Sequence, residues 1–149
     1  MEIYEMIRQH MTDNVPFAGY IGVELKEISG ERGVATLAKR TEVENHIQTM
    51  HAGAMFTLGE AASGAAMGGL LADQLLSVRP VAANASIKYV KTAKTDLTAI
   101  ATASVSQEEA LGALNTVGKV VFDVAVDIQD QDGNSCAEMI VAWHIKKLA

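Results

Sequence analysis

The sequence has one cysteine, Cys136, and only two prolines among its 149 residues. A single cysteine cannot form a disulfide within the chain, so nothing indicates an oxidising compartment. Basic residues are also scarce, because 12 lysines and arginines face 18 aspartates and glutamates, which gives a net charge of −6. Such a chain has no general positive field for nucleic-acid phosphates. We therefore expect a cytoplasmic protein that does not bind nucleic acid.

Signals for export or membrane insertion are also lacking. The N-terminus carries acidic residues where a signal peptide has basic ones. The most apolar stretch, residues 52–71, contains Glu60 and consists mainly of glycine and alanine, which disfavours a membrane span. Apolar residues make up 49% and charged residues 20% of the chain, close to the composition of folded globular domains. We expect one domain over residues 1–149 and no membrane contact.

Two segments have the apolar spacing of helices, a short one over residues 2–11 and a long one over residues 52–71. Other segments have the alternation or the composition of strands and are separated by turn residues. These strand-like segments are residues 20–29, 34–39, 81–92, 97–107, 116–129 and 135–147. Consecutive strands pair in the antiparallel sense, so the pattern predicts an α+β fold. In this fold the long helix lies on a curved antiparallel sheet of five to six strands.

Glycine and alanine occupy eleven of the twenty positions in residues 52–71. Each glycine costs a helix about 0.8–1.0 kcal/mol relative to alanine, so this segment is a poor helix in isolation. Small side chains let two backbones approach closely. We therefore expect the helix to be buried under the sheet, or against a second copy of the same helix.

Glu60 is the one charged residue in this predicted helix. A carboxylate in a buried, uncharged segment is unfavourable unless it is paired or faces a cavity. Desolvation raises the pKa of such a group toward the range of a general base. Glu60 is therefore a candidate catalytic residue. The alternative is an ordinary glutamate on the solvent face of an amphipathic helix.

The start of the long helix is a second candidate site. A polar loop containing Asn45, Gln48 and His51 leads directly into Ala52–Gly53. Free backbone N–H groups and the positive end of a helix favour a developing negative charge, such as that on an ester or thioester oxygen. The alternative is that His51 or Thr49 merely caps the helix.

These residues form a motif that resembles a known family. Residues 51–53 (His-Ala-Gly) precede residues 58–61 (Leu-Gly-Glu-Ala), and Asn45 lies six positions before the histidine. The motif, together with the order of elements over nearly the whole chain, resembles the hot-dog-fold acyl-CoA thioesterases of the phenylacetate and 4-hydroxybenzoyl-CoA type. In that family the motif is His-Gly-Gly, with an acidic residue eight positions after the first glycine. Here Ala52 replaces that glycine and Glu60 is the acid.

The resemblance implies a hot-dog fold and the hydrolysis of an acyl-CoA thioester to a free acid and coenzyme A, with no cofactor. It also implies a role for each matching residue. Glu60 would be the general base or the nucleophile, the Ala52 amide would bind the thioester oxygen, and Asn45 would orient water or the carbonyl. His51 would support the loop, and Gly53 completes the motif. Two alternatives stay open: a non-catalytic acyl-CoA-binding hot-dog domain, and a hot-dog hydratase or dehydratase with a histidine and an acid as its catalytic pair.

The spacing between Ala52 and Glu60 bears on assembly. Eight residues of one helix span about 12 Å, so one carboxylate does not readily reach a carbonyl held at its own helix start. If both groups act together, Glu60 comes from a second subunit. We therefore expect a homodimer with two interfacial sites, and the resemblance adds a possible homotetramer.

A local cluster of positive charge follows the long helix. Residues 79–94 contain four basic side chains and no acidic one. Basic groups bind phosphates, so these side chains are candidates for the nucleotide end of coenzyme A, although solvated strand positions explain them equally well. The substrate-binding candidates are Gln48, Arg79, Lys88, Lys91 and Lys94. The four histidines lack the paired spacing of metal ligands, so we expect no metal site.

Overall fold

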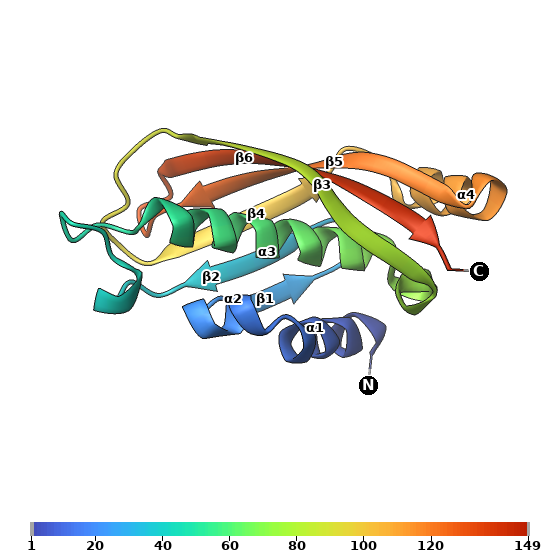
Figure 1. Cartoon of the computed structure of the whole chain (residues 1–149), viewed down its shortest axis with the longest axis horizontal. Coiled ribbons are helices and arrows are strands. Elements are labelled where there is room, and N and C mark those ends of the chain that lie inside the picture. Colours follow the sequence, from blue (N-terminus) through green and yellow to red (C-terminus); the bar gives the residue numbers. More distant parts are fainter. Residues whose placement is uncertain (1, 149) are drawn as a thin grey trace.

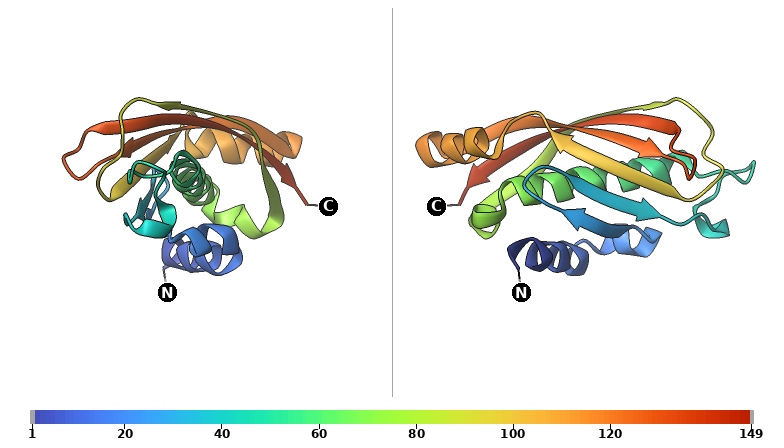
Figure 2. Two further views of the ribbon diagram at one scale, coloured as in Figure 1. Left: turned by 60° about the vertical axis from the view of Figure 1, so that its left-hand side comes forward. Right: turned by 180° about the vertical axis from the view of Figure 1, so that it is seen from behind.

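The computed structural model describes residues 2–148, so the two end residues of the expected domain lie outside it. A six-stranded antiparallel sheet curves around one long helix (Figures 1 and 2). The helices are α1 (Ile3–Asn14), α2 (Pro16–Ile21), α3 (Ala52–Leu70) and α4 (Gln107–Val117), with short 3-10 helices η1 (Thr41–Val43) and η2 (Ala72–Ser77). The strands are β1 (Glu24–Ile28), β2 (Gly33–Leu37), β3 (Val78–Tyr89), β4 (Leu97–Ala103), β5 (Lys119–Gln129) and β6 (Ser135–Lys147). The expected α+β hot-dog fold is confirmed.

The expected strand over residues 97–107 is confirmed at its start but is too long. β4 ends at Ala103, and α4 follows before β5 begins at Lys119. α4 starts with a capping box, in which the Ser106 Oγ accepts the Glu109 N–H at 3.1 Å and the Glu109 carboxylate accepts the Ser106 N–H at 3.5 Å. The expected strand over residues 20–29 is also too long, because helix α2 occupies its start.

The order of strands in the sheet is β1-β2-β4-β5-β6-β3. β3 pairs along its whole length with β6, from Val78 opposite Lys147 to Tyr89 opposite Ala137. Within residues 2–148, no strand covers the other edge of β3, and most of its side chains are exposed. An uncovered edge presents unpaired N–H and C=O groups to another chain.

α3 lies in the concave side of the sheet, and α1 and α2 lie on the side of α3 away from β5 and β6 (Figure 2). The helix approaches the β1–β2 hairpin at backbone distance. A Cβ on Gly33 of β2 would lie 2.5 Å from the Ala66 nitrogen and 2.8 Å from the Ala62 oxygen, and one on Gly69 would overlap the Ser29 carbonyl oxygen. This close approach provides the compensation expected for a glycine-rich helix. None of the helices in residues 2–148 combines the length and hydropathy needed to cross a membrane.

Candidate active site

Glu60 lies halfway along α3 and is neither fully buried nor exposed. It borders a cavity of about 110 Å³, here called the Glu60 cavity, whose other walls come from α1, α2, β1 and β6. Most of these walls are apolar, and they include Met11, Val15, Leu25 and Trp143. Across residues 2–148, no hydrogen bond or ion pair involves the Glu60 carboxylate. Burial raises the pKa of Glu60 above its ordinary value, because the charged form loses solvent.

Two buried side chains connect the helical turn of Glu60 to the sheet. The Trp143 Nε1–H donates to the Ser63 Oγ at 3.1 Å, and the Ser63 hydroxyl donates to the Glu60 carbonyl oxygen at 2.7 Å. Ser63 is fully buried, so neither bond competes with solvent. The contacts hold the Trp143 ring in place as a wall of the Glu60 cavity.

The first turn of α3 is capped by His51. The His51 Nδ1 accepts the Gly53 N–H at 2.8 Å, which requires an unprotonated Nδ1. The Gly53 amide is therefore occupied, whereas the structure records no acceptor for the Ala52 N–H within residues 2–148. The Ala52 carbonyl accepts the Tyr89 hydroxyl at 3.0 Å. The helix start thus offers the Ala52 N–H, with Tyr89 of β3 beside it.

Asn45 organises the loop before α3. Its Oδ1 accepts the backbone N–H groups of Ile47 and Thr49, at 3.1 and 3.0 Å, and its Nδ2 donates to the Thr49 Oγ1 at 2.7 Å. The Asn45 side chain is thus engaged within its own loop, and its expected role in orienting water or the carbonyl stays a prediction. Gln48 is exposed and adopts a left-handed backbone conformation, with φ at 58°.

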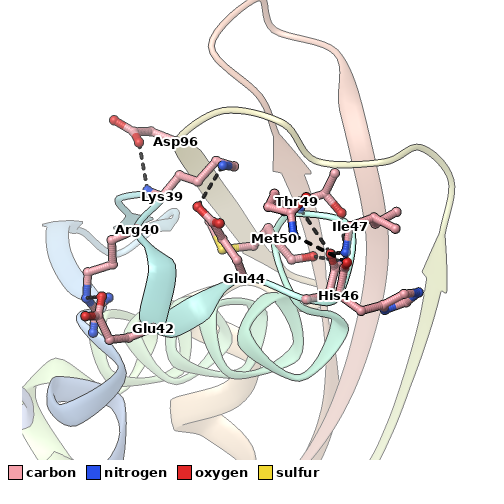
Figure 3. Close-up of polar contacts among 11 residues, drawn as sticks. Lys39, Arg40, Glu42, Glu44, His46, Ile47, Thr49, Met50 and Asp96 are labelled. Atoms are coloured by element: carbon pink, nitrogen blue, oxygen red, sulfur yellow. Dashed lines mark hydrogen bonds and ion pairs between the residues drawn. The ribbon is translucent and has the colours of Figure 1, made fainter.

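Three further contacts anchor this loop to the rest of the chain, and Figure 3 shows those of Lys39. The Lys39 ammonium group pairs with the Glu44 carboxylate at 2.8 Å, and the Lys39 N–H donates to the Asp96 carboxylate at 2.8 Å. The Met50 N–H donates to the Ala93 carbonyl at 2.8 Å. The linker between β3 and β4 therefore holds the loop against the start of α3.

An open cavity of about 400 Å³ adjoins the helix start and is bordered by Asn45, Ala52, Tyr89 and Lys91 among others. Sequence reasoning missed Tyr89 because it lies 37 residues from Ala52 and meets it only through the sheet. No local pattern marks it as a site residue.

The four basic candidates do not form one cluster within a single chain. Lys91 borders the helix-start cavity, with its Nζ 3.4 Å from the Asp130 carboxylate. Lys88 is next to Tyr89 near the same end of β3, and Lys94 is exposed in the following linker. Arg79 lies at the opposite end of β3, about 30 Å from Lys88 at the rise of an extended strand.

Ala52 and Glu60 are eight residues apart on α3, which corresponds to about 12 Å along the helix axis. Within one chain, the Glu60 carboxylate therefore does not lie beside the Ala52 N–H. Among residues 2–148, no group of three or more histidine, cysteine, aspartate or glutamate side chains is arranged to hold a metal ion.

Comparison with protein families places this chain in a family. The model of the domain of unknown function DUF4442 matches residues 4–145, which is nearly the whole chain. The chain belongs to the DUF4442 family. No curated protein matches this DUF4442 protein.

Solved structures similar to this DUF4442 protein include a protein of unknown function from Pseudomonas aeruginosa, described as a probable thioesterase. Its TM-score is 0.80 at 20% identity, covering 96% of this chain and 95% of that one. The PaaI protein of the E. coli phenylacetic acid degradation operon has a TM-score of 0.77 at 18% identity, with 99% and 97% coverage. A thioesterase from Haemophilus influenzae has a TM-score of 0.77 at 16% identity, with 97% and 91% coverage. At these identities the likeness shows the hot-dog fold.

Proposed function

We propose that this DUF4442 protein hydrolyses acyl-CoA thioesters to a free acid and coenzyme A. The observation that carries the proposal is the Glu60 carboxylate, which is partly desolvated, borders an apolar cavity and has no partner within residues 2–148. A carboxylate with a raised pKa is suited to accept a proton near neutral pH. The similar structures described as thioesterases agree with this chemistry.

In the proposed reaction, the thioester carbonyl oxygen accepts the Ala52 N–H at the helix start. Glu60 removes a proton from water as the water oxygen bonds to the carbonyl carbon, or the Glu60 carboxylate itself attacks that carbon. The negative charge that forms on the carbonyl oxygen is stabilised by the Ala52 amide and the positive end of α3. Collapse of the tetrahedral intermediate breaks the C–S bond, and the departing thiolate of coenzyme A takes up the proton that Glu60 removed from water. In the second route, C–S cleavage leaves a mixed anhydride on Glu60. Water then cleaves this anhydride to the free acid and protonated Glu60, which gives its proton to the thiolate.

We further propose that the protein acts as a homodimer, because Ala52 and Glu60 are too far apart on one helix. The N-terminal half of α3 has one incompletely buried face, and α1 covers the later glycines. This face consists of Gly53, Phe56, Thr57, Glu60 and Ala61. Its centre is Thr57, so antiparallel packing of two copies about Thr57 would bring the Ala52 end of each helix beside the Glu60 turn of the other.

Pairing of two copies along the uncovered β3 edge would continue the sheet and agrees with this helix packing. β3 runs from Val78 to Tyr89, so antiparallel pairing about its middle would bring the second copy's Arg79 beside Lys88. The basic residues that are apart in one chain would then lie together near the helix-start cavity. We propose that they bind the phosphates of coenzyme A with Lys91, Lys94 and Gln48.

The test is thiol release from acyl-CoA substrates of different acyl groups by the wild type and by Glu60→Gln, which keeps the side-chain shape but removes the base. We expect a loss of roughly 10²-fold or more in the variant, the range typical of a general base. Glu108→Gln is the matched control, because Glu108 is exposed on α4. Equal activity of the wild type and Glu60→Gln would exclude Glu60 as the base. Saturable acyl-CoA binding without thiol release would instead support the binding-domain alternative.

A further inference from the structure

Two more cavities follow the Glu60 cavity along α1. The middle cavity, of about 270 Å³, lies between α1, α3, η2 and β3, and the outer cavity, of about 500 Å³, lies between α1 and η2. Met11 and Val15 border both the Glu60 cavity and the middle cavity. His10, Leu75 and Leu76 border both the middle and the outer cavity. The three cavities therefore form a continuous row.

Met11 separates the first two cavities. A Cβ on Gly68 would lie 3.0 Å from the Met11 Sδ, and a Cβ on Gly64 would lie 3.4 Å from the Met11 Cε, so the side chain lies directly across these two helix positions. Methionine is unbranched and has three rotatable bonds, and it changes rotamer at small cost. Rotation of Met11 would join the Glu60 cavity to the middle cavity without any change in the backbone.

We propose that the three cavities are one channel for the hydrocarbon chain of a medium- to long-chain acyl-CoA, and that Met11 moves aside when the chain enters. This inference rests on the proposed function, because it starts from the site at Glu60. The outer cavity is lined by apolar residues together with His10, Asp73 and Ser77. Two of the apolar side chains are highly exposed, with Met6 at 54% and Leu76 at 78% of full exposure. Burial of a hydrocarbon chain against them would remove this apolar surface from water.

The length of the channel defines the substrate class. From Val15 to Ile3, α1 spans about 18 Å at 1.5 Å per residue. An extended hydrocarbon advances about 1.25 Å per carbon, from a C–C bond of about 1.52 Å and an angle near 111°. The channel therefore accommodates roughly 14 carbons, whereas the Glu60 cavity alone is smaller than the 150 Å³ cavity that binds benzene.

An acyl chain explains the row better than a second copy of the protein. The middle and outer cavities lie along α1 and η2, away from the face of α3 that centres on Thr57. The middle cavity adjoins the Glu60 cavity across Met11, and the walls of both cavities are mostly aliphatic. Occupation by a second copy is one of the outcomes that the experiment distinguishes.

The experiment uses binding rather than turnover, so that it does not depend on hydrolysis. Trp143 is the only tryptophan and borders the Glu60 cavity, so its fluorescence reports an occupied channel. The probes are non-hydrolysable acyl-CoA thioether analogues with 4 to 16 carbons, numbers chosen to bracket the roughly 14 carbons of the channel. In the wild type we expect the dissociation constant to fall by up to about fourfold per methylene and to level off near that length.

Leu76→Asp places a charge in the outer walls at an exposed position that does not affect the core. It is expected to weaken binding of the longest probes by at least tenfold, with the loss confined to chains that reach residue 76. Met11→Phe places a rigid ring between the first two cavities. In this variant, the dissociation constant is expected to stop falling once the acyl chain is long enough to fill the Glu60 cavity. Val117→Asp is the control, because Val117 is similarly exposed, at 65%, but lies on α4.

Three results would overturn the channel. The first is a dissociation constant that does not change beyond six carbons, and the second is an equal loss for all chain lengths in Leu76→Asp. The third is a change in oligomeric state in Leu76→Asp, measured by light scattering, which would assign the outer cavity to a contact between copies. Binding that depends on chain length without any thiol release from acyl-CoA would support the channel and refute the proposed hydrolysis.

Discussion

Gly69→Ala tests whether the glycines of α3 are there for close backbone approach. A Cβ at this position would overlap the Ser29 carbonyl oxygen and lie 2.9 Å from the Ser29 carbonyl carbon. Ser29 belongs to the tight turn of the β1–β2 hairpin, where its N–H donates to the Arg32 carbonyl at 3.0 Å. The obstacle is therefore backbone within a closed turn, which moves only if the hairpin or the helix moves.

The magnitude follows from two opposing effects. Replacing glycine by alanine in a helix gains about 1 kcal/mol of helix propensity. Overpacking a core costs about 1–3 kcal/mol, and a clash with fixed backbone belongs at the upper end of that range. We therefore expect Gly69→Ala to lower the free energy of unfolding by about 2 kcal/mol.

Gly112 provides the matched control, because it also lies in a helix, α4, and a Cβ there meets nothing within 4 Å. Gly112→Ala should raise the free energy of unfolding by about 1 kcal/mol, so the two variants should differ by about 3 kcal/mol. In urea, with a slope near 2 kcal/mol/M, their midpoints should lie about 1.5 M apart. If Gly69→Ala is as stable as Gly112→Ala, the close approach does not explain the composition of the helix.

Five further predictions concern the site. Turnover should rise with pH through the raised pKa of Glu60, and a midpoint at or below the ordinary glutamate range would contradict the assignment. Because the folded state raises that pKa, ionisation of Glu60 opposes folding, and the wild type loses stability as the pH rises through the folded-state pKa. Glu60→Gln cannot ionise, so it should melt at a higher temperature than the wild type at neutral pH but not at acidic pH. Ser63→Ala should cost about 1–3 kcal/mol in urea unfolding, because the buried Trp143 N–H loses its acceptor, and a neutral result would show that this bond contributes nothing. His51→Ala should lose about 1 kcal/mol of stability, which His51→Asn should largely restore as another side-chain cap; failure of the rescue would argue against capping. Thr57→Lys places a charge at the centre of the incompletely buried face of α3. The variant should be monomeric in light scattering and inactive, and an active dimer would refute the proposed packing.

Local patterns in the sequence predict much of the fold. The expected helix over residues 52–71 corresponds to α3 at Ala52–Leu70, because apolar spacing and the polar loop mark both its face and its start. The alternation over residues 116–129 corresponds to the buried face of β5, where Phe122, Val124 and Val126 point to the core. Such patterns involve only residues that are close together in the sequence, so they can be recognised without knowledge of the rest of the chain.

Other features depend on contacts that no local pattern contains. The position of β3 at the edge, beside β6, requires pairing across 48 to 69 residues of chain, from Tyr89 opposite Ala137 to Val78 opposite Lys147. The contact of Tyr89 with Ala52 follows from the same pairing. In contrast, helix α4 has a local signal, the spacing of Ser106 and Glu109, which the strand-like residues before it obscured.

The strand order also determines when the sheet can be completed during synthesis. β3 is made before β4, α4 and β5, but its only strand neighbour in residues 2–148 is β6, which is made last among the described strands. A ribosome adds about 5–20 residues per second, so β3 waits several seconds without a partner while its backbone groups remain open to other strands. The nascent chain is therefore most exposed to mispairing between the synthesis of β3 and that of β6. Synonymous codons that slow translation between β3 and β6 are expected to reduce the yield of folded protein. Synonymous codons that slow translation after β6 should leave the yield unchanged.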